Sequence, residues 1–203
     1  MSTSPLLGAN ALPTAVEIGG RAFPIRHDFT DGIRFEMLVC DKAVPESVKL
    51  ALALQLWFPE MPDADLGDVL SAMLKFYRCG KDDNAEADSS EQLYSYAHDY
   101  DLIYAGFLSA YGIDLFTCGP LHWWRFKAML SALPDSSQFI KVVGYRAVRI
   151  TPDMPKEQRA FLTKMKRIYA LPELADGRPV HLGSDEEYRR AIEAIREAKA
   201  CMP

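Results

Sequence analysis

The order of apolar and polar residues along the chain predicts a short β-hairpin followed by a series of helices. Residues 15–26 contain two short extended runs on either side of Gly19-Gly20, a pair that accepts the positive φ angles of a tight turn. From residue 28 onward, apolar residues recur every three or four positions, which is the period of an amphipathic helix. A short helix ending at Val143 is predicted to precede an extended segment. Longer helices are predicted over residues 28–41, 45–58, 65–80, 93–112, 121–134 and 155–171.

These periods also predict which side chains face the core. In the first helix, the apolar residues Phe29, Ile33 and Met37 lie four positions apart. Gly32 weakens the helix prediction there, because glycine is a poor helix former. In the helix over residues 155–171, the predicted apolar face consists of Phe161, Leu162, Met165, Ile168 and Tyr169.

The predicted fold class is mainly α, a helical bundle-like domain with a small N-terminal β-hairpin. This domain is predicted over residues 15–173, after a flexible leader over residues 1–14. A polar, acidic and unpatterned stretch over residues 81–92 is predicted to be a mobile loop within it. Residues 174–203 are predicted to be a linker and a C-terminal helix that opens with a capping box.

Two adjacent tryptophans, Trp123 and Trp124, stand in the sequence LHWWRF at residues 121–126. A helix turns about 100° per residue, so the two indoles cannot share one narrow face. Trp123 falls on the apolar stripe formed by Phe126, Leu130 and Leu133, which predicts a core position. Trp124 falls on the flank of that stripe, where it belongs either to a wide core face or to a contact surface.

Composition and charge exclude several classes of protein. The 203 residues are 49% apolar, which is ordinary for a globular protein. The net charge of −5 gives no general attraction to nucleic acid or to an anionic membrane. No apolar run approaches the roughly 20 residues that a transmembrane helix needs, and the N-terminus lacks the pattern of a signal peptide. The four cysteines are scattered without a CxxC pair, so we expect reduced thiols in a cytosolic protein.

Residues that carry chemistry are sparse. The chain has no GxGxxG or phosphate-binding loop, no nucleophile elbow and no HExxH, and we predict no catalytic residue, metal ligand or cofactor. The best acid–base candidate is the cluster of His98, Asp99 and Asp101, although these residues also suit a helix N-terminus. His122 could orient a ligand or be a hydrogen-bonded structural histidine. The basic helix 155–171 could be solvated or could bind nucleic acid. It could also bind an acidic partner, which is either another protein or the acidic loop 81–91 of the same chain.

Several stretches of the sequence carry a family resemblance. In order along the chain they are RFEMLVCDKAVPESVKLALALQLWFPEMP, YSYAHDYDLIYAGFLSAYGIDL, LHWWRFKAMLSALPDSSQFIKVVGYR and PKEQRAFLTKMKRIYALP. Together they resemble the bacteriophage gene-product-fifteen family over residues 22–173. The resemblance implies a small, mostly helical, non-enzymatic protein encoded in the tail-morphogenesis module of a long-tailed phage, beside the tape-measure protein.

The resemblance also implies a role and partners. Proteins in this genomic position resemble tail-assembly chaperones, which cover the long helical tape-measure protein and recruit tail-tube subunits in the host cytoplasm. The residues predicted to form the partner-binding surface are Trp124, Tyr111, Phe116 and Arg125, because aromatic and arginine side chains are frequent interface anchors. The alternatives are a structural component of the virion, in the tail or the head–tail connector, and a small-molecule-binding protein or enzyme. Association of identical chains stays open.

Overall fold

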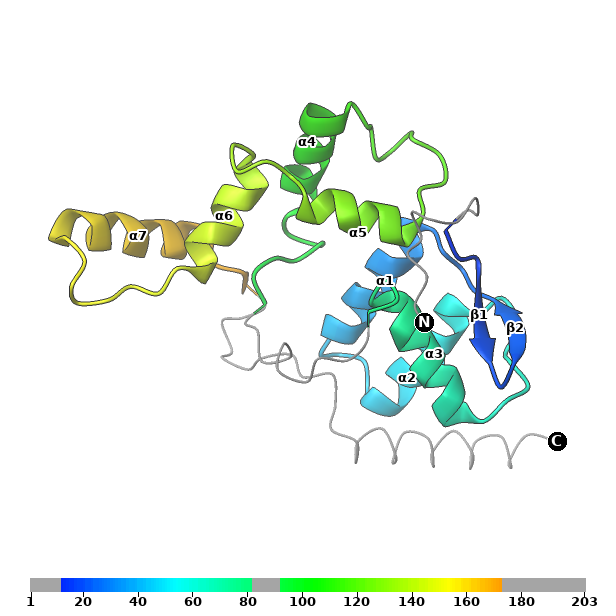
Figure 1. Ribbon diagram of the computed structural model, residues 1–203. Coiled ribbons are helices and arrows are strands. Elements are labelled where there is room, and N and C mark those ends of the chain that lie inside the picture. Colours follow the sequence, from blue (N-terminus) through cyan, green and yellow to red (C-terminus); the bar gives the residue numbers. More distant parts are fainter. Residues whose placement is uncertain (1–11, 82–91, 173–203) are drawn as a thin grey trace. The chain divides into compact units, whose positions relative to one another are not determined.

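The computed structural model describes residues 12–81 and 92–172 (Figure 1). Within these residues the chain forms a two-stranded hairpin and seven helices, which confirms the predicted mainly α class with a small N-terminal hairpin. The contacts group into two compact units. In terms of the described residues, the first unit contains 12–81 and 120–127, and the second contains 92–119 and 128–172.

The hairpin opens the first unit, as predicted. Strands β1 (Ala15–Ile18) and β2 (Arg21–Pro24) pair in antiparallel register, with Ile18 opposite Arg21. Gly19 and Gly20 form the two-residue turn, with φ angles of 56° and 75°. Positive φ at both positions suits the right-handed twist of the strands and costs glycine nothing sterically. Strand β1 packs against helix α3, and Ile18 is buried.

Three helices surround the core of this unit: α1 (Phe29–Cys40), α2 (Glu46–Trp57) and α3 (Leu66–Tyr77). Asp28 and Asp65 begin α1 and α3 as N-caps, since each carboxylate accepts a hydrogen bond from the backbone N–H two residues later. Between the helices lies an aromatic cluster whose neighbouring ring centroids are 4.9–6.5 Å apart. Its members are Phe35, Trp57, Phe76, Tyr77 and Trp123.

Residues 120–127 return to the first unit from far along the chain. The backbone N–H of Phe29 donates to the carbonyl of Leu121 at 2.8 Å, and that of Trp123 donates to His27 at 2.6 Å. These bonds fix the start of α5 (Trp123–Ser131) against α1. Trp123 is completely buried, which confirms its predicted core position.

Gly32 lies in the middle of α1 because of this indole. A Cβ atom at residue 32 would stand 2.1 Å from Cε3 of Trp123 and 2.4 Å from Cδ2. Carbon atoms in contact are about 3.5–4.0 Å apart, so only glycine lets the helix backbone approach the ring. The residue that weakens the helix prediction is therefore the one that the packing of α1 requires.

The second unit is built around α6 (Gln138–Ala147), which packs against α4 (Tyr100–Tyr111) and against α7 (Lys156–Ile168). The last residues of α5 also belong to this unit. Gly112 ends α4 in the left-handed region at φ 65°, as its position after the apolar pattern predicts. The buried apolar side chains of the unit include Ile103, Phe107, Leu130, Leu133, Phe139 and Val142.

Several predictions about individual elements are wrong. The helix predicted from residue 93 begins at Tyr100, because Asp99 accepts the N–H of Ser95 and holds the preceding residues in a turn. Helix α6 continues past Val143 to Ala147. Of the three apolar residues four positions apart in α1, Phe29 is buried as predicted, but Met37 is 47% exposed because the helix also buries Gly32 and Phe35.

The predicted leader 1–14, acidic loop 81–92 and C-terminal segment 174–203 lie mostly or wholly outside the described residues and stay predictions. Where the leader ends, the chain is held in place: the carbonyl of Thr14 accepts the N–H of Ile25 at 3.0 Å. Among the described residues no helix is long and apolar enough to cross a membrane.

Candidate interaction surface

Both tryptophans of the LHWWRF sequence bind the C-terminal end of α3. The indole N–H of Trp123 donates to the carbonyl of Tyr77 at 2.9 Å, and that of Trp124 donates to the carbonyl of Phe76 at 2.7 Å. The last carbonyls of a helix lack partners within the helix. The Trp123 indole satisfies that of Tyr77, and the Trp124 indole gives that of Phe76 a second donor besides the backbone N–H of Cys79. Trp124 is half-buried against the Phe76 ring, which leaves part of its own ring for a partner.

A cleft of about 710 Å³ lies in the first unit, between the residues that follow β2 and the start of α5. His122 stands in it with both ring nitrogens occupied: Nε2 lies 2.9 Å from the carbonyl of Pro13, and Nδ1 accepts the N–H of Trp124 at 3.1 Å. Burial lowers the pKa of His122. The hydrogen bond with the Pro13 carbonyl opposes that shift of the pKa, and the neighbouring His27 and Arg125 add to it. This is the hydrogen-bonded structural histidine that the sequence left open, and its arrangement suits the neutral imidazole.

The acidic side chains of the cleft also take part in the fold. Asp28 caps α1 through one carboxylate oxygen and accepts the N–H of Leu121 at 3.1 Å through the other. Burial raises the pKa of Asp31, although Arg34 opposes that shift from 3.2 Å. Arg125 lines the cleft and is exposed.

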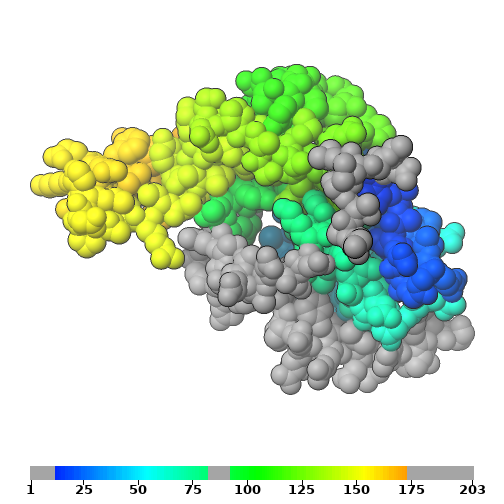
Figure 2. Space-filling model, in the orientation of Figure 1, coloured from blue at the N-terminus to red at the C-terminus, as the bar shows by residue number. Residues whose placement is uncertain are grey.

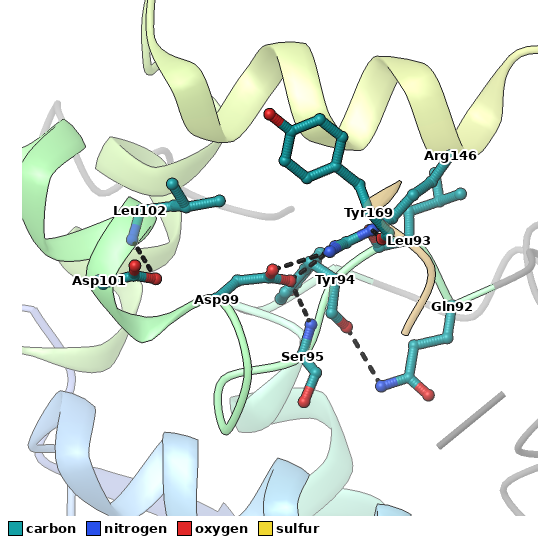
Figure 3. Close-up of polar contacts among 9 residues, drawn as sticks. All are labelled: Gln92, Leu93, Tyr94, Ser95, Asp99, Asp101, Leu102, Arg146 and Tyr169. Carbon is teal, nitrogen blue, oxygen red and sulfur yellow. Dashed lines mark hydrogen bonds and ion pairs between the residues drawn. The ribbon is translucent and has the colours of Figure 1, made fainter. Parts of the chain in front are cut away.

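The predicted acid–base cluster is a structural junction in the second unit (Figure 3). Asp99 is 3% exposed and forms two hydrogen-bonded contacts with Arg146, at 2.6 and 2.8 Å. The same guanidinium donates to the carbonyls of Leu93 and Tyr169, at 2.9 and 2.6 Å. Arg146 therefore ties the loop before α4 to the end of α7. The Asp101 carboxylate bonds the backbone N–H of Leu102, at the first turn of α4.

Helix α4 presents an uncovered apolar face. Tyr100 and Leu108 are 61% and 44% exposed, and Tyr104 lies between them at helical spacing. In the loop after the helix, Phe116 is 75% exposed and its ring lies 4.9 Å from that of Tyr104. We refer to Tyr100, Tyr104, Leu108 and Phe116 as the aromatic stripe. Asp101 is the only charged residue among the twelve of α4.

The loop that carries Phe116 is well defined. The carboxylate of Asp114 accepts the N–H of Phe116 at 2.9 Å, and the carbonyl of Asp114 accepts the N–H of Thr117 at 3.1 Å. Such a side-chain turn fixes the backbone locally. Phe116 is therefore held over Tyr104 while most of its ring faces solvent, which is the geometry of an interface anchor.

The four residues predicted to bind a partner are thus divided between the units. Trp124 and Arg125 belong to the first unit, and Tyr111 and Phe116 to the second. Tyr111 is half-buried, and its hydroxyl donates to the carbonyl of Met129 at 2.8 Å. The aromatic stripe adds three residues that the sequence reasoning did not assign to a partner-binding surface, Tyr100, Tyr104 and Leu108. The apolar composition of α4 on all its sides was a signal for an exposed apolar face, because such a helix cannot bury every side against one core.

The described residues contain no group of three or more metal-ligating side chains. Among the described residues, Cys79 and Cys118 carry free thiols. Burial raises the pKa of Cys79, so its thiol stays protonated at neutral pH.

Comparison with protein families supplies an identity for this arrangement. Residues 9–171 match the family described as Bacteriophage Gp15 protein, which is most of the chain and includes the hairpin and all seven helices of the described residues. Searches of curated proteins and of solved structures give no match. The chain therefore belongs to the bacteriophage Gp15 protein family, and it is a structural or assembly protein of a phage.

Proposed function

We propose that this protein is a non-enzymatic tail-assembly factor that binds the phage tape-measure protein, and through it the tail-tube subunits, while the tail is built. The observation that carries the proposal is the aromatic stripe, which is uncovered and almost uncharged on a helix that is firmly packed in its unit. A tape-measure protein has long amphipathic helices that need covering before assembly. Aromatic side chains on a helix face are suited to bind such helices.

Leaving the aromatic stripe in water forgoes the free energy that a partner would supply by covering it. Burying a large apolar side chain is worth roughly 1.5–3 kcal/mol, and the stripe leaves most of Phe116 and Tyr100 in water. Exposed apolar groups that are contiguous on a surface usually mark a binding site. Trp124 and Arg125 remain candidates for a further contact in the first unit.

The test is co-expression with the long, coiled-coil-rich protein encoded downstream, followed by affinity capture and light scattering. Wild type should keep that partner soluble and co-purify with it. The double variant Leu108→Ser and Phe116→Ser should lose it while keeping its circular dichroism spectrum. A matched control is Met61→Ser, which removes an apolar side chain that is 45% exposed in the first unit and should leave capture unchanged.

Two outcomes count against the proposal. Failure of wild type to associate with the tape-measure protein removes the assembly role. Capture that survives the double variant places binding somewhere other than the aromatic stripe. Mass spectrometry of purified particles decides between an assembly factor, which should be absent from finished tails, and a structural component of the virion.

A further inference from the structure

Helix α7 belongs to the second unit, but none of its residues is buried. Each of the other six helices of the described residues contributes buried side chains. In α7, Phe161 and Ile168 are 50% and 52% exposed, so the apolar face predicted from the sequence is only partly covered. The space-filling view shows the atoms of α7, in yellow and orange, open to solvent on the face in view (Figure 2).

The helix is nevertheless held in a defined position. The ring of Tyr145 on α6 stacks with that of Tyr169 at 5.9 Å and meets the edge of Phe161 at 6.0 Å. Arg146 donates to the carbonyl of Tyr169, and Gln138 donates to its hydroxyl at 3.3 Å. One side of α7 is therefore anchored to α6, and Phe161 takes part in that contact. About half of Phe161 and half of Ile168 stay exposed to solvent beside it.

The charge of α7 is opposite to that of the rest of the chain. Lys156, Arg159, Lys164, Lys166 and Arg167 give five positive charges, and Glu157 gives one negative charge, for a net +4 over residues 156–168. Since the whole chain carries −5, the remaining residues carry −9. A concentrated positive charge on an acidic protein attracts an acidic ligand to that helix.

The apolar and basic side chains share the outer face. At 100° per residue, Phe161 and Ile168 project within about 20° of each other, and Lys164 and Arg167 follow on one side of them. Phosphate groups of a nucleic acid would contact the basic residues but would leave the two apolar side chains without partners. A helix with an apolar stripe and acidic flanks fits both features at once.

We propose that the outer face of α7, defined by Phe161, Lys164, Arg167 and Ile168, is a second docking surface, and that it binds an acidic amphipathic helix of a partner protein. Partner apolar residues cover Phe161 and Ile168, while partner carboxylates pair with Lys164 and Arg167. This surface differs in chemistry from the nearly uncharged aromatic stripe on α4, so a single chain can hold two different helices.

The binding experiment uses the full chain and a labelled synthetic helix of 18 residues, with leucines at i, i+4, i+7 and i+11 and glutamates on their flanks. Fluorescence anisotropy measures its Kd. We expect the charge-reversal variant Lys164→Glu with Arg167→Glu, and the apolar variant Phe161→Ser with Ile168→Ser, each to weaken binding at least tenfold. Circular dichroism verifies that both variants stay folded. Met61→Ser, in the first unit and outside both proposed surfaces, is the matched control and should bind as wild type does.

A twin peptide with lysine in place of glutamate makes the test sharper. It should bind wild type weakly and the charge-reversal variant tightly, which a general loss of structure could not produce. The proposal is overturned if wild type binds neither peptide, or if the α7 variants bind the acidic peptide as wild type does. It is also overturned if a DNA duplex displaces the peptide and binds with a steep salt dependence, because α7 is then a nucleic-acid surface. None of these results depends on the tape-measure protein, so the two proposals fail separately.

Discussion

Replacing Gly32 with alanine should strongly destabilise the first unit, although the same change stabilises an ordinary helix. In an unpacked helix, alanine is better than glycine by roughly 0.5–1 kcal/mol. Here the new Cβ would stand 2.1 Å from the Trp123 ring, so the ring has to move by more than about 1 Å to reach normal contact. Trp123 is fully buried between Tyr77 and Phe126, and its N–H is bonded to Tyr77.

The expected cost follows from these opposing effects. Overpacking a close-packed core costs typically about 1–3 kcal/mol, and loss of the indole hydrogen bond costs about another 1 kcal/mol. After subtracting the helix propensity gain, we expect Gly32→Ala to lower the free energy of unfolding by about 1–3.5 kcal/mol. Urea denaturation followed by tryptophan fluorescence measures this directly, because Trp57, Trp123 and Trp124 all belong to the first unit.

Gly144→Ala is the matched control. Gly144 is also inside a helix, α6, but a Cβ there meets nothing within 4 Å. That substitution should therefore stabilise the second unit by roughly 0.5–1 kcal/mol, measured by calorimetry. Gly32→Ala could instead prove neutral, or stabilising like the control. In either case the close approach of α1 to Trp123 is not the reason for the glycine. Combining Gly32→Ala with Trp123→Leu should cost less than the sum of the two changes, since the smaller side chain leaves room for the Cβ.

Three further predictions concern the polar contacts. Arg146→Met should destabilise the second unit by about 3–5 kcal/mol in calorimetry, because it leaves the Asp99 carboxylate buried without its cation. Adding Asp99→Leu should recover part of this loss. A double variant that is no more stable than Arg146→Met would contradict the prediction. His122 has a lowered pKa in the folded state, so the unfolded state takes up the proton first as the pH falls. The free energy of unfolding should therefore fall as the pH drops below about 6.5, by at most about 1.4 kcal/mol per pH unit. Urea midpoints between pH 5 and pH 7.5 should show that slope in wild type and not in His122→Gln, since protonation removes the acceptor that Nδ1 offers. Trp124→Phe should stay folded, but its free energy of unfolding should fall by about 0.5–1.5 kcal/mol, because the Phe76 carbonyl loses its indole donor. An unchanged midpoint in urea denaturation would show that this hydrogen bond does not contribute to stability.

Local patterns in the sequence were enough to predict local structure. The turn at Gly19-Gly20, the cap at Gly112 and the core position of Trp123 each depend on residues within about ten positions along the chain, and all three are confirmed. The start of α4 differs from the prediction because Asp99 holds Ser95 in a turn and is itself held by Arg146, 47 residues later, and no period in the sequence relates Asp99 to Arg146. Long-range pairing of this kind has to be seen in the fold.

The candidate surfaces were only partly predictable for the same reason. Phe116 was selected from its residue type, and its 75% exposure is consistent with that choice. Tyr100 and Leu108 could not be assigned to the outside, because α4 is apolar all round and the sequence does not say which side meets α6. On α7, the sequence predicts a conventional buried face for Phe161 and Ile168, and only the structure shows that the face is left half open.

The return of residues 120–127 to the first unit has a consequence for how the chain is made. Trp123 and the carbonyl of Tyr77 that it binds are 46 residues apart, so the ribosome has to synthesise the whole of α4 before that core can close. At roughly 5–20 residues per second, α1 to α3 wait about 2–9 s for the ring that fills the space beside Gly32. During that interval the nascent chain exposes the apolar surface that Trp123 later covers. The first unit is thus finished only after the whole of α4 and the start of α5 have been translated, and a chain that stops after α3 cannot complete it.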